Sequence, residues 1–289
     1  MKQKLPYIYV ISAAILWGCM GILVRTMNGG GLSSAEVVTV RAIITSIIMV
    51  LGMFLFNRKE LRIRPKDIWC FVGTGILSVV FFNICYFTCM NYCSLSTAAI
   101  LLYTAPAFVM VMSFFLFKEG FTKKKVLALV CSFAGCVLVS GGFGSSSIGL
   151  MGLLTGLGAG FGYALYSIFG RYALQRGYSS FTITTYTFLF AAVGCLPITG
   201  MGHITECFLA QPSMILQAVV WTFLTTVAAY LLYTKGLAGM EAGKASVLAT
   251  VEPVMASVVG VVLFKEEFTW MALAGIGLVL VSSILMVRE

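Results

Sequence analysis

Apolar residues fill ten long runs along the chain, each bounded by Gly, Pro, Ser or a charged residue. Hydrocarbon about 30 Å thick requires roughly 20 apolar residues in a spanning helix, and every run is close to that length. Because 60% of the residues are hydrophobic and only 10% are charged, one water-soluble core cannot bury them all. The pattern predicts an all-α integral membrane protein with ten transmembrane helices, at residues 6–25, 34–56, 68–90, 95–117, 126–143, 149–171, 180–200, 213–235, 243–264 and 269–287.

The chain also repeats itself, since residues 86–122 align without a gap with residues 233–269, at a spacing of 147. The aligned pairs, 146 or 147 residues apart, are Trp17 with Tyr163, Arg25 with Arg171, Pro106 with Pro253, and Glu119 with Glu266. A weak internal repeat in so apolar a chain is typical of membrane proteins built from two halves. The repeats are expected at 1–143 and 149–289. Five spans per half is an odd number, so we expect two inverted five-helix repeats.

The distribution of Lys and Arg predicts the orientation, because short loops rich in these residues stay on the cytoplasmic side. With the N-terminus inside, sixteen of the nineteen lie at the inner side, Arg25 and Lys265 lie at the outer side, and Arg41 lies within a span. We therefore expect a multi-pass protein of the cell (inner) membrane with both termini cytoplasmic. The net charge of +9 reflects this topology and no nucleic-acid partner, since the basic residues are scattered over short loops with few aromatic residues between them.

Two stretches of the repeat share one pattern, in which a run of small residues leads to a proline and then to an apolar helix that ends in a glutamate. They are residues 86–119, YFTCMNYCSLSTAAILLYTAPAFVMVMSFFLFKE, and residues 233–266, YTKGLAGMEAGKASVLATVEPVMASVVGVVLFKE. The pattern resembles the signature of the EamA-like branch of the drug/metabolite transporter superfamily, as do Trp17 with Gly18 in the first span and Arg41 in the second.

This resemblance covers the whole chain and implies secondary transport of small organic metabolites by alternating access. We expect export of amino acids or related compounds. An importer, or a carrier of drugs or nucleotide precursors, has the same pattern, and a non-transporting membrane protein is the remaining alternative.

Two charged residues within the spans are the first candidates for the site. Glu252 is the only acid near the predicted midplane, roughly 14 Å along its span at 1.5 Å per residue. A desolvated carboxyl there suits proton coupling or capture of a cationic group, or else a structural hydrogen bond beside the Pro253 kink. Arg41, about 10 Å below the outer surface, suits binding a substrate carboxylate or phosphate, pairing with Glu252, or anchoring its helix. Glu36 is expected instead to form a capping box with Ser33. The expected partners are a small-molecule substrate, the lipid bilayer and a coupling proton.

Aromatic residues with polar tips inside the spans complete the candidate site. A buried hydroxyl, indole or amide needs a hydrogen-bond partner, which a wet cavity supplies, and packing in the core is the alternative for each. Tyr233 is a further tyrosine within a span. Pro106 and Pro253 are expected to kink the fourth and ninth helices and to act as hinges. The candidate substrate-binding residues are Trp17, Arg41, Asn83, Tyr86, Tyr103, Tyr163, Tyr166, Tyr230, Thr250 and Glu252.

Enzymatic chemistry is not expected. Asp67 is the only aspartate and lies at the inner surface, which argues against a protease with paired aspartates, and the only histidine, His203, is expected to be solvated in an outer loop. Cys85, Cys89 and Cys93 share one helix face, but no methionine or histidine matches their spacing, so no metal site is predicted. No cofactor is expected, and the oligomeric state, monomer or homodimer, stays open.

Overall fold

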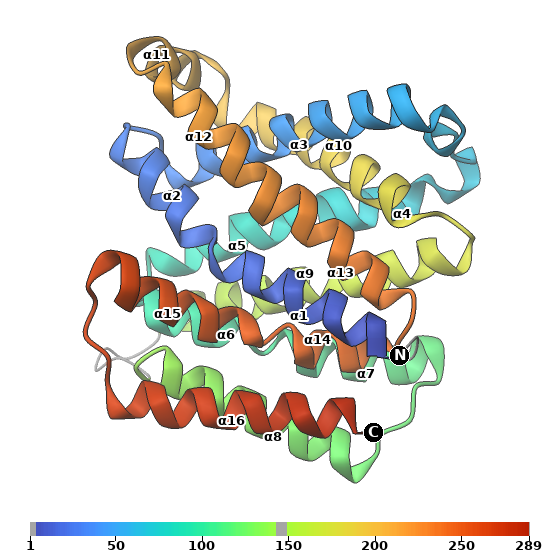
Figure 1. Cartoon of the computed structure of the whole chain (residues 1–289), viewed down its shortest axis with the longest axis vertical. Coiled ribbons are helices and arrows are strands. Elements are labelled where there is room, and N and C mark those ends of the chain that lie inside the picture. Colours follow the sequence, from blue (N-terminus) through green and yellow to red (C-terminus); the bar gives the residue numbers. More distant parts are fainter. Residues whose placement is uncertain (1–3, 143–148, 289) are drawn as a thin grey trace.

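The computed structural model describes residues 4–142 and 149–288, and within these ranges the chain is helical and forms no strand (Figure 1). The α-helices are α1 (Leu5–Gly18), α2 (Met20–Gly29), α3 (Ser34–Phe56), α4 (Ile68–Val72), α5 (Phe81–Met90), α6 (Leu95–Leu102), α7 (Ala105–Phe117), α8 (Lys123–Val139), α9 (Leu150–Gln175), α10 (Ser180–Thr199), α11 (Gly202–Ala210), α12 (Ser213–Thr222), α13 (Ala229–Leu237), α14 (Ala242–Leu248), α15 (Val251–Phe264) and α16 (Trp270–Val287). Two short 3-10 turns, Arg58–Leu61 and Pro65–Asp67, precede α4.

Nine helical stretches in the described part of the chain are long and apolar enough to cross a membrane. Five of them are each built from shorter helices that follow one another: α1 with α2, α4 with α5, α6 with α7, α12 with α13, and α14 with α15. The remaining predicted span, the fifth along the chain at 126–143, corresponds to α8, which has 17 residues and is the shortest. Its predicted end at residue 143 lies outside the described residues. The prediction of an all-α multi-pass membrane protein is confirmed.

Both the third and the eighth spans contain a stretch of π-helix. Gly73–Val80 joins α4 to α5, and Phe223–Ala228 joins α12 to α13. The two segments fall at corresponding places in the repeat, since subtracting 147 from the second range gives 76–81. A π-helical turn widens the helix and redirects its side chains, and such turns often occur at functional sites.

The fourth and ninth spans are interrupted near their middles, at the predicted prolines. The chain passes from α6 to α7 directly before Pro106, and from α14 to α15 two residues before Pro253. Each break frees backbone carbonyls that lipid cannot satisfy. In each break a threonine hydroxyl, that of Thr104 or Thr250, donates at 2.6 Å to the carbonyl three residues earlier. The predicted interruption of both helices is present.

The repeat extends to individual backbone angles. Lys118, after α7, and Lys265, after α15, both have φ of +58°, and they are the only non-glycine residues with positive φ in the described ranges. A threonine then caps the next helix in each half. Thr122 Oγ1 accepts from the backbone N–H of Lys125 at 3.2 Å, and Thr269 Oγ1 accepts from that of Ala272 at 3.1 Å. The two halves therefore have the same local design in spite of their different sequences.

The last spans of the two halves, α8 and α16, cross at a pair of glycines. A Cβ on Gly135 would lie 2.8 Å from the carbonyl oxygen of Gly275, and a Cβ on Gly275 would lie 2.6 Å from the carbonyl oxygen of Gly135. Gly135 also contacts Val279, and Gly275 contacts Val139, so numbers fall along α16 as they rise along α8 (Figure 1). The two helices are antiparallel, as an inverted repeat requires, and their missing side chains allow the close approach.

Helices of the first half pack against helices of the second throughout the molecule (Figure 1). α1 packs on α13 and α15, α5 packs on α9, and α3 packs on α10. The largest buried cluster lies between the halves and includes Trp17, Tyr166, Tyr233, Leu237 and Leu248. The two halves thus share one core.

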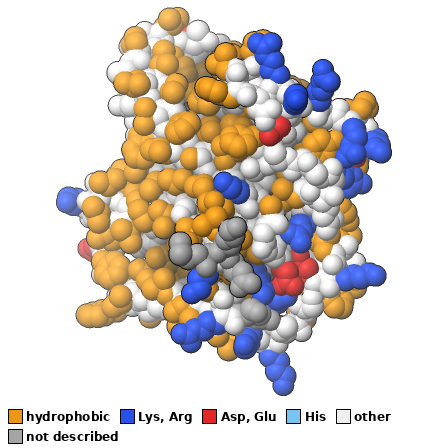
Figure 2. All heavy atoms as spheres, turned by 45° about the vertical axis from the view of Figure 1, so that its right-hand side comes forward, with side chains coloured by type: hydrophobic (Ala, Val, Ile, Leu, Met, Phe, Trp, Pro, Cys, Tyr) orange, Lys and Arg blue, Asp and Glu red, His pale blue; other side chains and the backbone are white. Residues whose placement is uncertain are grey.

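Lys and Arg side chains gather on one side of the molecule, whereas apolar side chains cover most of the remaining surface in view (Figure 2). This side bears the turns between α3 and α4, α7 and α8, and α9 and α10, together with both ends of the described chain (Figure 1). We name it the inner face, and the opposite side the outer face, after the predicted orientation.

Asp67 lies at the inner face and connects its turns by hydrogen bonds. The residue is 2% exposed, and its carboxylate accepts hydrogen bonds from Arg64 at 2.8 Å, Arg176 at 2.9 Å and Tyr178 at 2.8 Å. A buried carboxylate requires such partners. Asp67 therefore fixes the start of the third span to the turn between α9 and α10.

The second span begins with the predicted capping box. Ser33 Oγ accepts from the Glu36 backbone N–H at 3.3 Å, and Glu36 Oε2 accepts from that of Ser33 at 2.8 Å. The prediction that His203 is solvated agrees with its side chain, which is 55% exposed, but the residue lies in a helix and not in a loop. His203 belongs to α11, and its Nδ1 lies 2.9 Å from Glu36 Oε1.

Candidate functional site

Five aromatic side chains meet where α1, α9 and α13 pack together. The indole of Trp17 contacts the rings of Tyr163, Tyr230 and Tyr233, with centroids 6.3, 5.2 and 5.1 Å away. The ring of Tyr166 lies 5.0 Å from that of Tyr230 and 6.0 Å from that of Tyr233. Trp17 is 8% exposed and Tyr166 is 5% exposed. We call these five residues the aromatic cluster, and it brings together four of the predicted site residues.

The polar tips of two cluster tyrosines are satisfied within the protein. The hydroxyls of Tyr166 and Thr234 are 2.7 Å apart, and those of Tyr233 and Ser167 are also 2.7 Å apart. Both hydrogen bonds join α9 to α13. Protein hydroxyls thus take the place that the sequence reasoning assigned to cavity water, and they fix the rings in position.

Glu252 lies in the first turn of α15, directly after the break in the ninth span. Its Oε2 accepts a hydrogen bond from the Tyr163 hydroxyl at 3.0 Å, which ties the carboxylate to the aromatic cluster. Tyr103 and Thr250 line the same small space as Glu252. On its backbone side, Gly18 of α1 packs so closely that a Cβ there would lie 2.7 Å from the Glu252 carbonyl oxygen. The predicted residues Tyr103, Tyr163, Thr250 and Glu252 therefore lie together.

Arg41 enters the same region from α3. Its Nε donates to Thr226 Oγ1, in the π-helical part of the eighth span, at 3.1 Å. No ion pair joins Arg41 to Glu252 within the described residues, and the Glu252 carboxylate accepts from Tyr163 instead. Each of these half-buried charged groups is thus held by a neutral hydroxyl. A guanidinium has five N–H donors and a carboxylate has about four acceptor sites, so both keep unused hydrogen-bonding capacity.

The packed side chains leave little room for a ligand in this conformation. One space of about 10 Å³ borders the aromatic cluster, Ser78 and Phe82, and a second of about 10 Å³ borders Glu252, Tyr103 and Pro106. Tyr163 lines both. A space of this size accommodates about one water molecule. A metabolite therefore requires the surrounding helices to separate.

Two predicted residues lie away from this site. Asn83 donates through Nδ2 to the Val79 carbonyl at 2.7 Å and lines a different space, beside Phe87 and Cys195. The ring of Tyr86 contacts that of Phe82, with centroids 5.8 Å apart, and Phe82 in turn contacts Tyr163 of the cluster. The structure thus separates Asn83 from its repeat partner Tyr230.

Four side chains at the site were missed by the sequence reasoning: Ser78, Phe82, Ser167 and Thr226. Ser167 follows Tyr163 by four residues and Thr226 precedes Tyr230 by four, so helical spacing places each pair on one face and was a usable signal. Ser78 lies within a π-helical segment. The direction of the Ser78 side chain depends on this π-helical turn, and the spacing of apolar residues in the sequence does not predict such a turn.

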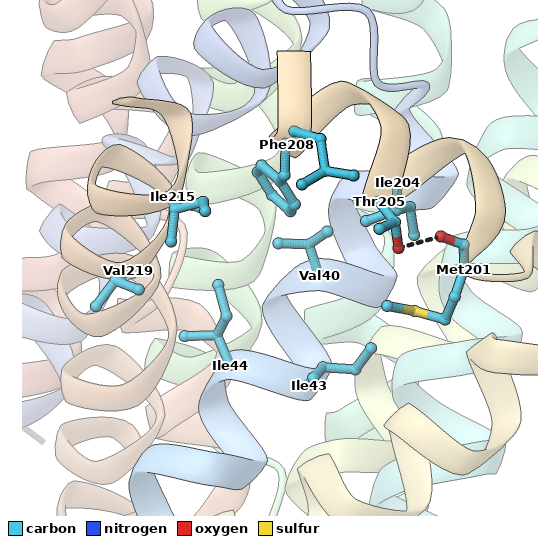
Figure 3. A pocket seen from close by; sticks show the side chains of 11 residues that line it. Val40, Ile43, Ile44, Met201, Ile204, Thr205, Phe208, Ile215 and Val219 are labelled. Atoms are coloured by element: carbon cyan, nitrogen blue, oxygen red, sulfur yellow. Dashed lines mark hydrogen bonds between the residues drawn. The ribbon is translucent and has the colours of Figure 1, made fainter. Parts of the chain in front are cut away.

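A larger groove lies elsewhere and is apolar. It encloses about 350 Å³ between α3, α11 and α12, and Val40, Ile44, Phe208 and Ile215 point into it (Figure 3). Its one hydroxyl, on Thr205, donates to the backbone carbonyl of Met201 at 2.8 Å (Figure 3). No free polar group of this lining faces the groove, so it cannot recognise a polar solute in the way that the aromatic cluster and Glu252 can.

These features define a multi-pass membrane protein in which two inverted repeats enclose a buried aromatic site with one carboxylate and one guanidinium. Relatives and a family model agree with that class. The chain belongs to the EamA-like transporter family, whose model matches residues 4–141 and again residues 150–288. The family resemblance of the sequence is therefore confirmed.

Individual relatives extend over almost the whole chain. The chain is 24% identical to the uncharacterized transporter YetK of Bacillus subtilis (strain 168), over 96% of this chain and 90% of that protein. It is 23% identical to the uncharacterized transporter YwfM of the same organism, over 98% and 95%. A solved crystal structure superimposes with a TM-score of 0.78 over 97% of this chain and 95% of its own, at 16% identity. That likeness shows the fold alone.

Proposed function

We propose that this chain is a secondary transporter that exports a small zwitterionic metabolite, an amino acid or a related compound, by alternating access. The observation that carries the proposal is the pair of half-buried opposite charges, Arg41 in the first half and Glu252 in the second. They flank the aromatic cluster and are not paired with each other. Because a buried charge is costly unless it is compensated, a ligand that carries both a carboxylate and an ammonium matches this site.

Each end of such a ligand has a partner of suitable chemistry. A guanidinium binds a carboxylate through two parallel hydrogen bonds, so Arg41 is assigned the carboxylate end. Glu252 is assigned the ammonium, and the neighbouring ring faces of Trp17 and Tyr163 attract the same positive charge. When the ammonium leaves, a proton can take its place on Glu252. This exchange supplies the proposed coupling to a proton gradient.

Transport needs the site to open alternately to the two faces, since the present spaces are too small for a metabolite. The proposed moving units are the repeats 1–143 and 149–289, and the breaks before Pro106 and Pro253 are the proposed hinges. One chain contains both repeats, so a monomer suffices for this mechanism and a homodimer is not required. The bias of Lys and Arg toward the inner face supports a cell (inner) membrane location with both termini in the cytoplasm.

The test is uptake of labelled compounds into vesicles that contain the purified protein, with and without a pH gradient. The panel contains zwitterionic amino acids, cationic drugs and nucleosides, and protein-free vesicles and an Arg41→Ala variant are the controls. Saturable uptake of one or more amino acids that is lost in Arg41→Ala supports the proposal. Transport of cations or nucleosides only, or equal amino-acid uptake by both proteins, contradicts it. Faster loss of the same label from preloaded cells that express the protein tests the direction.

A further inference from the structure

The first turn of α14, at the inner face, is closed off by a glutamate of the other half. The backbone N–H groups of Ala242 and Gly243 donate to the Glu119 carboxylate at 2.9 and 3.1 Å. Ala242 is 0% exposed. The equivalent turn, 147 residues earlier, is the start of α6 at the outer face, where Leu95 is 62% exposed. One end of the molecule is therefore covered where the equivalent end is open.

An arginine shows the same asymmetry. At the inner face, Arg171 Nη1 donates to the backbone carbonyls of Leu237 and Met240 at 2.9 and 2.8 Å, which fastens the end of α9 to the end of α13. In the described part of the chain its repeat partner at the outer face, Arg25, donates to neither equivalent carbonyl. Arg25 forms an ion pair with Glu266, and its guanidinium lies 3.9 Å from the ring centroid of Phe264.

Helix packing agrees with these contacts. At the inner face α14 packs closely against α7. At the outer face α6 and α15 are the equivalent helices, and they form no comparable packing in the described part of the chain. The structure is therefore closed at the inner face and open at the outer face. Its inner contacts show what a closed outer face would contain, because the two halves are related by the repeat.

We propose that Arg25 and Glu266 are the latch residues that close the outer face. When that face closes, Arg25 donates to the carbonyls of Met90 and Cys93. These carbonyls lie 147 residues before those of Leu237 and Met240, which Arg171 uses at present.

Glu266, the repeat partner of Glu119, then accepts from the N–H groups of Leu95 and Ser96. Arg171 and Glu119 release their partners in the same step. This inference rests on the proposed alternating access, and it adds the residues that would hold each state.

The present ion pair is well suited to exchange. The side chains of Arg25 and Glu266 are 52% and 48% exposed, and an ion pair in contact with water contributes little stability. Breaking this ion pair therefore costs less free energy than is gained from the four hydrogen bonds that replace it. Two of these are donated by Arg25 to carbonyl groups, and two are donated by backbone N–H groups to Glu266. Loss of Arg25 should accordingly weaken the closed outer face more than the open one.

Amide hydrogen exchange measured by mass spectrometry, on the full chain in lipid nanodiscs, tests the latch without labels. Segments 94–98 and 241–246 report the outer and the inner face. In the unmodified protein, 241–246 should exchange more slowly than 94–98. Arg171→Gln removes an inner fastening, so exchange at 241–246 should rise at least about tenfold while 94–98 becomes protected. Adding Arg25→Gln to that variant should abolish the new protection at 94–98.

Lys124→Gln removes a positive charge from the same face at an exposed position and is the matched control, with no change expected in either segment. Glu119→Gln is a second, milder way to weaken the inner closure if Arg171→Gln fails to fold. The latch is wrong if 94–98 gains no protection when the inner face opens, or if the protection persists in the double variant. Exchange that follows this pattern in a protein that transports no tested metabolite would instead contradict the proposed substrate and leave the latch supported.

Discussion

The contact between α1 and the segment that carries Glu252 depends on Gly18. A Cβ at position 18 would lie 2.5 Å from Met255 Cβ, 2.7 Å from the Glu252 carbonyl oxygen and 2.9 Å from the Ala256 nitrogen. Two of these atoms belong to backbone and the third is a Cβ, so no rotamer change can relieve the overlap. Gly18→Ala should force α1 and α15 apart, at a cost of roughly 1 to 3 kcal/mol, as in other overpacked cores.

Gly21, three residues later, is the matched control, because a Cβ there meets nothing within 4 Å. Gly21→Ala should be neutral or stabilise α2 by up to about 1 kcal/mol through helix propensity. Thermal unfolding of the two purified variants in the same detergent, followed by tryptophan fluorescence, should give a lower midpoint for Gly18→Ala by several degrees. Metabolite uptake should fall in the same variant, since the displaced segment carries Glu252. Equal midpoints and equal uptake for the two variants would refute the close packing at Gly18.

Three further outcomes are expected. Glu252→Gln should remain folded, because an amide oxygen can still accept from Tyr163, but uptake should fall and lose its pH dependence. Normal, pH-dependent uptake would assign the carboxyl a structural role. Arg41→Lys should weaken substrate binding by about 1 to 3 kcal/mol, measured as a rise in the uptake KM of about five- to 150-fold, and Arg41→Ala should be worse. An unchanged KM in both would remove Arg41 from recognition. Impermeant thiol reagents should reach cysteines placed at positions 59 and 124 from the inner side and at 203 from the outer side. Position 145, which lies outside the described residues, is also expected at the outer side. Labelling of 59 and 203 from one side would overturn the inverted topology.

The sequence alone was enough for the class, the spans and the repeat. Lipid cannot hydrogen-bond to a peptide group, so long apolar runs must be helical, and their length is fixed by the hydrocarbon. The break of the ninth span before Pro253 and the capping box of Ser33 with Glu36 were likewise readable, since both depend on residues that are neighbours along the chain.

Which side chains meet was decided only by the tertiary structure. Arg41 was expected either to pair with Glu252 or to act separately, and a π-helical turn brings Thr226 to Arg41 instead. Asn83 matches Tyr230 in the repeat, yet the two face different spaces, because a single conformation does not give all equivalent positions the same neighbours.

The contacts that close the inner face show most clearly that the sequence does not determine which side chains meet. Glu119 and Glu266 stand in the same LFKE sequence, and nothing in that sequence distinguishes them. In the folded chain one carboxylate accepts from the first turn of α14, and the other forms an exposed ion pair with Arg25. A sequence that repeats specifies two equivalent sets of contacts, whereas one conformation can form only one of them at a time. Long-range packing of the two halves therefore selects which set is made.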